Sequence, residues 1–169
     1  MSEFARLFDV RQSEGKVVKL EASASERQAL ARRFGLVAVE RLDATLDLAR
    51  DGLAVDAQGR MIAKFVQSCA VSGEDLAVSA DEPLTFRFVP AAAPHRPDEE
   101  VELDADALDE IEYEGTQFDL GEAVAQSLAL AIDPFAVGPG AANARRRAGL
   151  LDPDTSGPFA ALAALKKSD

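Results

Sequence analysis

Apolar and polar residues alternate along three stretches of the chain, at 36–50, 60–71 and 77–89. In the first stretch, one parity is apolar and the other is polar: Leu42, Ala44, Leu46 and Leu48 alternate with Arg41, Asp43, Thr45 and Asp47. A period of two places apolar side chains on one face and polar side chains on the other, which is typical of half-buried strands in an antiparallel sheet. The pattern therefore predicts three long strands.

Residue pairs that favour turns lie between or beside these predicted strands. Asp51-Gly52 and Gln58-Gly59 read as turns, and residues 72–75 read as a hairpin loop. Short turns between successive strands predict an antiparallel meander.

Two shorter strands are expected near the N-terminus, at 3–10 and 16–21, each with apolar residues on one side of the pleat. The two are close enough to pair with each other across residues 12–15.

The first helix is predicted from a capping box, in which the Ser23 hydroxyl accepts from the amide of Glu26 and the Glu26 carboxylate reaches back. It should run to Phe34, because Gly35 suits a left-handed stop. A second helix should begin at Asp119 as N-cap and finish before Asp133-Pro134, since a residue before proline avoids the helical region.

These elements predict an α+β fold: an antiparallel β-meander or partly closed barrel of about five to seven strands, with two or three helices and a short C-terminal helix. Residues 1–135 should form a single α+β domain that includes an acidic loop at about 90–110. Residues 136–169 are expected to be a flexible tail with a short terminal helix at 159–165.

The formal net charge of −12 is not spread evenly along the chain but is concentrated between residues 90 and 135. Between residues 90 and 135, thirteen carboxylates meet only Arg96. One interpretation is a solvated, partly disordered connection. The other is a surface that recruits a basic partner, such as a ribosomal protein. Nucleic-acid binding by the whole surface is disfavoured, because it depends on Lys and Arg contacts to phosphates.

Known catalytic and metal-binding patterns are not supported. One cysteine and one histidine cannot supply a four-ligand zinc site or an internal disulfide. Gly138-Pro-Gly140 lacks the pattern of a phosphate-binding loop, and the acidic run fits no calcium loop. The sequence therefore predicts no metal, no cofactor and no catalytic residue. With no apolar run long enough to span a membrane, we expect a cytoplasmic protein.

Cys69 lies in an apolar stretch, so we expect a small buried core residue whose thiol pKa is raised by its surroundings. A thiolate nucleophile is the alternative, although no histidine lies near Cys69 in the sequence.

Three segments stand out together: 60–73 with Gln67 and Cys69, the Asp119-Leu-Gly121-Glu122 helix start, and Phe159-Ala-Ala-Leu162-Ala-Ala-Leu165. In this order, and with the Glu26-Arg27 and 30–36 stretches, nearly the whole chain resembles the YceD family, the large ribosomal RNA subunit accumulation proteins, in their alphaproteobacterial form. Many members carry a Cys-x-x-Cys pair and a second cysteine set that look like a metal site. Here those ligands are absent, so no zinc is implied.

The resemblance implies a non-enzymatic factor that promotes accumulation of large-subunit ribosomal RNA and ribosome assembly. With an acidic chain, contact with a basic ribosomal protein or assembly factor is the expected mode, and neither DNA nor a membrane is an expected partner. The candidate interaction residues are Gln67, Cys69, Asp119, Gly121, Glu122, Arg145, Arg146, Arg147, Phe159, Leu162 and Leu165.

Two alternatives stay open. One is a small-molecule-binding or enzymatic domain with an unidentified site, and the other is an RNA-binding chaperone that uses its basic termini. The arginine triplet at 145–147 serves direct RNA contact in the second case and is otherwise a solubilising tail. The terminal helix either docks on its own domain or presents a short motif to a partner.

Overall fold

The structure is a computed structural model that describes residues 2–91 and 110–150. Its strands and helices are β1 (Leu7–Asp9), η1 (Val10–Gln12), β2 (Lys16–Glu21), α1 (Ala24–Phe34), β3 (Ala38–Asp51), β4 (Ala54–Ser68), β5 (Asp75–Pro90), β6 (Glu110–Tyr113), β7 (Gln117–Asp119), α2 (Leu120–Leu130) and α3 (Ala141–Arg147).

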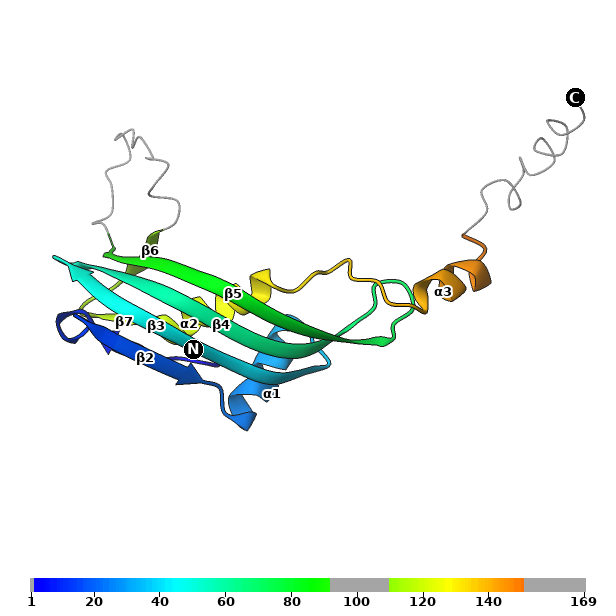
Figure 1. The fold of residues 1–169 in the computed structure, drawn as a ribbon, viewed down its shortest axis with the longest axis horizontal. Helices are drawn as coiled ribbons and strands as arrows, with labels where there is room; N and C mark the ends of the chain where they lie inside the picture. The colour runs from blue at the N-terminus through cyan, green and yellow to red at the C-terminus, as the bar shows by residue number, and fades with distance from the viewer. Residues whose placement is uncertain (1, 92–109, 151–169) are drawn as a thin grey trace, which may run out of the picture.

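The strands form a five-stranded sheet in the order β2-β3-β4-β5-β6 and a two-stranded sheet of β1 and β7 (Figure 1). Strands β2 to β5 pair antiparallel, whereas β6 pairs parallel to the end of β5. The predicted α+β class and the antiparallel meander are thus confirmed. The partly closed barrel is not, because the described strands form an open sheet that begins at β2 and finishes at β6.

One face of the large sheet carries the core. Leu42, Leu46 and the other apolar residues of that parity in β3 are buried, as the alternation predicts. Leu30 of α1 and Leu128 of α2 belong to the same apolar cluster, so both helices cover this face. Burial of this cluster from water, at roughly 25 cal/mol per Å² of apolar surface, is the main force that holds the two layers together.

The N-terminal strands pair differently from the prediction. β1 is only three residues long and pairs with β7, and β2 pairs with β3 instead. The turn of η1 separates them: the Ser13 hydroxyl donates to the Val10 carbonyl (2.7 Å), and the Gly15 amide donates to Leu48 of β3 (3.0 Å). These bonds direct the chain onto β3 and away from β1.

The turn predicted at Gln58-Gly59 is also wrong, because both residues lie inside β4. Gly59 is needed there for a different reason: a Cβ at this position would overlap the backbone of Thr45 in β3. The other two predicted turns, at 51–52 and 72–75, do connect strands, and Gly52 and Gly73 have positive φ.

The helix ends follow the sequence closely. Ser23 and Glu26 form the capping box of α1, and Gly35 ends it at φ 64°. Asp119 caps α2, which stops at Leu130, three residues before Asp133. Helix α3 falls within the stretch predicted as a tail, whereas the predicted terminal helix at 159–165 and most of the acidic loop lie outside the described residues. Among the described helices, none combines the length and the apolar composition required to cross a membrane.

Candidate functional site

The structure brings four of the candidate residues, Gln67, Cys69, Asp119 and Glu122, into two polar clusters. We call the first the α2 junction: Glu3, Arg6, Glu26, Arg33, Asp119 and Glu122. We call the second the loop junction: Gln67, Cys69, Glu74, Asp133, Gly138 and Gly140. Each cluster joins segments that are far apart in the sequence.

Asp119 is central to the α2 junction. Its Oδ1 accepts from the Glu122 amide (3.0 Å), which caps α2, and from the Arg6 amide (2.8 Å). The Leu120 amide donates in turn to the Arg6 carbonyl (3.0 Å). One carboxylate therefore begins a helix and attaches the N-terminal segment to it.

Gly121 lets these two segments approach each other. A Cβ at position 121 would overlap the carbonyl oxygen of Phe4, a backbone atom of a fully buried residue that has no room to move. The Asp-Leu-Gly sequence thus combines a helix cap, a core leucine and the one residue type that fits against the N-terminal backbone.

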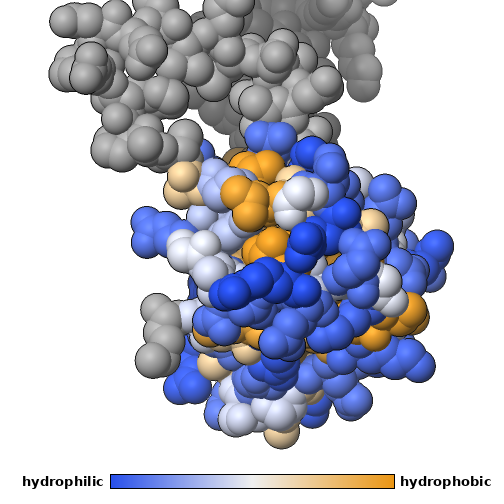
Figure 2. All heavy atoms as spheres, turned by 90° about the vertical axis from the view of Figure 1, so that its left-hand side faces the viewer, coloured by the Kyte–Doolittle hydropathy of each residue, from blue (hydrophilic) through white to orange (hydrophobic). Residues whose placement is uncertain are grey.

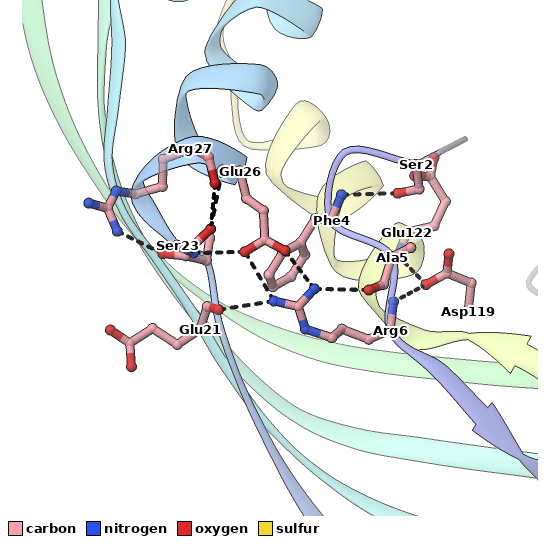
Figure 3. Close-up of polar contacts among 12 residues, drawn as sticks. Ser2, Phe4, Ala5, Arg6, Glu21, Ser23, Glu26, Arg27, Asp119 and Glu122 are labelled. Atoms are coloured by element: carbon pink, nitrogen blue, oxygen red, sulfur yellow. Dashed lines mark hydrogen bonds and ion pairs between the residues drawn. The ribbon is translucent and has the colours of Figure 1, made fainter.

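Arg6 connects this region to α1. Its guanidinium donates to both oxygens of Glu26 (2.7 and 3.1 Å) and to the Ala5 carbonyl (2.9 Å), as Figure 3 shows. The same Glu26 carboxylate accepts from the Ser23 amide (2.8 Å) and so completes the capping box. The Arg6 hydrogen bond, aided by Ser23, lowers the pKa of Glu26 to about 2.

Arg33 makes the second bridge between α1 and α2. It donates to both oxygens of Glu122 (2.9 and 2.6 Å) and to Glu3 (2.8 Å). The Arg33 hydrogen bond lowers the pKa of Glu122 to about 2 and the two carboxylates raise the pKa of Arg33. Because Glu26 and Glu122 keep their negative charge down to strongly acidic pH, neither is suited to proton transfer near neutrality.

The loop junction is built around Cys69, which lies just after β4 and is 4% exposed. Its Sγ accepts from the amides of Val71 (3.5 Å), Ser72 (3.3 Å) and Gly138 (3.3 Å). Hydrogen bonds from Ser72 and from the Gly138 amide lower the pKa of the thiol to about 6. The predicted burial is therefore confirmed, but the predicted rise in the pKa is wrong, because the nearest neighbours are hydrogen-bond donors.

The rest of the loop junction holds residues 133–140 against the β4–β5 loop. The Gln67 side-chain amide donates to the Asp133 carbonyl (2.7 Å), and the Ala70 amide donates to Ala136 (2.9 Å). Glu74 accepts from the Gly140 amide (2.8 Å), and a Cβ at Gly138 or Gly140 would overlap the Glu74 carboxylate. Hydrogen bonds connect these segments at the place where the resemblance would put a metal.

Sequence reasoning missed several members of these clusters, among them Glu3, Arg6, Arg33 and Glu74. Arg6 and Glu74 carry no local signal, because their partners lie in distant parts of the chain. Arg33 falls inside the 30–36 stretch that contributes to the resemblance and Glu122 is a candidate residue, but nothing in the sequence predicted that the two would pair.

The remaining candidates lie elsewhere. Arg145, Arg146 and Arg147 form the exposed last turn of α3, and no described carboxylate forms an ion pair with them. Phe159, Leu162 and Leu165 lie outside the described residues, as does His95.

An open groove of about 600 Å³ runs between α1 and β3, lined by small and apolar residues together with Arg27 and Gln28. In the part of the chain that the structure describes, no group of three or more His, Cys, Asp or Glu side chains is arranged to hold a metal. Comparisons with protein-family models, with curated proteins and with solved structures find no match for this chain.

Proposed function

We propose that this protein is a non-enzymatic factor that promotes accumulation of large-subunit ribosomal RNA and ribosome assembly in the cytoplasm. In this proposal it acts through contact with a basic ribosomal protein or assembly factor. The proposal rests first on the segments that carry the resemblance to the YceD family. The structure adds the contacts that these segments make with one another.

The observation that carries the proposal is the convergence of these segments in space. The stretch 26–36 and the Asp119–Glu122 helix start, 83 residues or more apart in the sequence, meet in the α2 junction through Arg33 and Glu122. The stretch 60–73 meets residues 133–138 in the loop junction through Gln67 and Cys69. Residues that hold one fold together are what a shared family fold would require, so the convergence supports the resemblance.

Charge at one end of the sheet supports a basic partner. Arg87 is surrounded by three carboxylates, Asp56 (2.9 Å), Asp51 (3.5 Å) and Glu110 (3.5 Å), so this cluster keeps an excess of negative charge. It lies beside the end of β5 and the start of β6 at Glu110. The surface seen from this end is mostly hydrophilic, with apolar patches between the polar residues (Figure 2). Opposite charges would speed and orient the encounter with a basic protein.

A second candidate function is direct RNA contact through Arg145, Arg146 and Arg147. It is favoured by their exposure at the end of α3 without a carboxylate partner among the described residues. Arginine side chains of this kind neutralise phosphates and make binding strongly dependent on salt.

The test is purification of the tagged full chain from cell lysate at low salt, with and without ribonuclease. We expect large-subunit proteins to be recovered in both cases and to be lost at high salt. Recovery that disappears with ribonuclease, or on changing all three arginines to alanine, would favour the RNA-binding candidate. Recovery of no large-subunit component would count against both.

A further inference from the structure

The outer edge of β5 is unpaired over most of its length. β4 pairs with β5 from Asp75 to Phe88, but β6 pairs with it only from Arg87 to Pro90. On the side away from β4, residues 75–86 therefore have no partner strand in the part of the chain that the structure describes (Figure 1). An unpaired edge presents a row of amide and carbonyl groups to which another chain can add.

The direction of these groups follows from Pro83, which lies opposite Arg60 and has no amide hydrogen. A regular ladder accommodates proline only where the nitrogen faces away from the partner strand, and this direction recurs at every second residue. The Ala91 amide, which has the same parity, donates outward to Tyr113 of β6 (2.9 Å). The amides of Ala77, Ser79 and Asp81 therefore also face the open edge.

Protection against edge pairing differs between the two sides of the sheet. The outer strand β2 is six residues long and carries Lys16 and Lys19, and lysine on an edge discourages pairing. In β5, the stretch Leu76-Ala-Val-Ser-Ala80 has no charged residue, and charge occurs only at its two ends, at Asp75 and Asp81.

The segment after α2 runs alongside this edge (Figure 1), and it carries exposed apolar side chains. Leu130 and Ala131 line one recess with Glu82 and Leu84, while a Cβ at Gly138 would touch the Leu76 side chain. Along this segment and at the end of α2, Leu130 is 88% exposed, Phe135 is 81% exposed and Val137 is 53% exposed. An added strand would bury part of this apolar surface, which favours its binding.

The acidic residues beside the β5 edge determine which kind of added strand would bind there. Asp75 and Glu82 flank the open stretch, and neither forms an ion pair with a described residue. A second copy of this chain, with a net charge of −12, would bring more negative charge to the same place. We propose that the edge of β5 from Asp75 to Asp81 receives, as an additional strand, an extended segment of a partner protein that carries lysine or arginine beside apolar residues. The class of partner, a basic ribosomal protein or assembly factor, rests on the proposed function.

Amide hydrogen exchange of the isotope-labelled full chain tests the edge directly. In the free protein, the Ala77, Ser79 and Asp81 amides should exchange quickly, and the Leu76, Val78 and Ala80 amides, which face β4, should exchange slowly. On adding individually purified basic proteins of the large ribosomal subunit, at least one should slow exchange at all three edge amides. Slow exchange already present in the free monomer, or in a dimer found by light scattering, would overturn the proposal.

A matched pair of variants at one position completes the test. Ser79→Pro removes the outward amide and places a ring at the edge, and it should weaken binding about tenfold or more. Ser79→Ala keeps the amide and should bind within about twofold of the unchanged chain. Slow exchange of the Leu76, Val78 and Ala80 amides shows that a variant is folded. If Ser79→Pro does not fold, the exchange measurement on the unchanged chain still tests the proposal.

The outcomes separate the two proposals. Binding of a large-subunit protein that leaves the three edge amides exchanging quickly, or that is equal for both variants, would overturn the edge proposal and leave the proposed function standing. Binding by none of these proteins, together with recovery of no large-subunit component from lysate, would overturn both.

Discussion

The α2 junction and the loop junction both join distant segments, but they do so with different chemistry. In the α2 junction, two arginines each bridge to carboxylates, and the pKa values of Glu26 and Glu122 fall to about 2. In the loop junction, backbone amides and the Gln67 side chain make most of the bonds, and the pKa of the Cys69 thiol is lowered to about 6. Charge pairing therefore fixes the helices in the first, and backbone geometry fixes the loop in the second.

This difference shows what the motifs are for. The residues that carry the resemblance are largely occupied in contacts with one another, and the surfaces left open for a partner are others: the β5 edge, the acidic cluster around Arg87 and the arginines of α3. Changes in the two junctions should therefore act mainly on stability, and they should differ in their response to pH.

The largest effect is expected for Gly121→Ala. The added Cβ would overlap the Phe4 carbonyl oxygen, so α2 must shift away from the N-terminal segment, at an expected loss of about 3 kcal/mol or more in the free energy of unfolding. Urea unfolding measures this loss. Leu130→Ala, at the 88% exposed last residue of the same helix, serves as the control and should change the value by less than about 0.5 kcal/mol. Equal values for the two variants would show that the close approach at Gly121 does not exist.

A smaller loss is expected for Asp119→Ala, which removes both the cap of α2 and the acceptor for the Arg6 amide. Loss of a helix cap costs about 1 to 2 kcal/mol. Asp119→Asn keeps a side-chain oxygen acceptor and should recover much of this loss. If the asparagine variant were as unstable as the alanine variant, hydrogen bonding by the Asp119 side chain would not be the cause.

The ion pairs of the α2 junction should contribute about 1 kcal/mol or less each at neutral pH, because their side chains are partly exposed. Their pH dependence is more specific. The pKa values of Glu26 and Glu122 are lowered by folding, so their contribution is complete above the ordinary carboxyl pKa of 4.5 and is lost as the pH falls toward 2. Unfolding measured between pH 6 and pH 2.5 should show a shallower decline for Glu122→Gln than for the unchanged chain. Parallel curves would contradict the assignment.

The smallest expected effect is the ionisation of a single group in the loop junction, the Cys69 thiol. Thiolate absorbance of the folded protein should rise with a midpoint near pH 6, because the pKa of Cys69 is lowered to about 6, and in denaturant the midpoint should return to the ordinary range. As a pKa lowered by folding requires, any stabilisation from the thiolate is largest at high pH and is lost as the pH falls through 6. Cys69→Ala should abolish the signal. A folded midpoint at or above pH 8.5 would mean that the donors around Sγ do not act on it.

Local features were predictable from the sequence, and long-range ones were not. Alternation identified the inward face of β3, and the Ser23, Gly35 and Asp119 signals placed the helix ends, because strand faces and helix caps depend on residues close in sequence. The pairing of β1 with β7 joins residues more than a hundred positions apart and leaves no local pattern.

The roles of three glycines were also not predictable, because they depend on residues that are distant in the sequence. Gly59 looked like a turn residue because glycine is common in turns, but its role is set by the β3 backbone beside it. Gly138 and Gly140 suggested a mobile tail, whereas Glu74, more than sixty residues away, gives them a defined place. The lowered pKa of Cys69 follows from hydrogen bonds with Ser72 and with the amide of Gly138, and the sequence around the cysteine does not reveal the second of these.

The central claim is association with the large ribosomal subunit or its precursors through a protein contact. Sedimentation of the tagged full chain through a density gradient, alongside ribosomal subunits and their precursors, tests it most directly. The account predicts that the chain moves with large-subunit particles at low salt, stays with them when Arg145, Arg146 and Arg147 are changed to alanine, and returns to the top of the gradient at high salt. A chain that remains at the top at every salt concentration would contradict it.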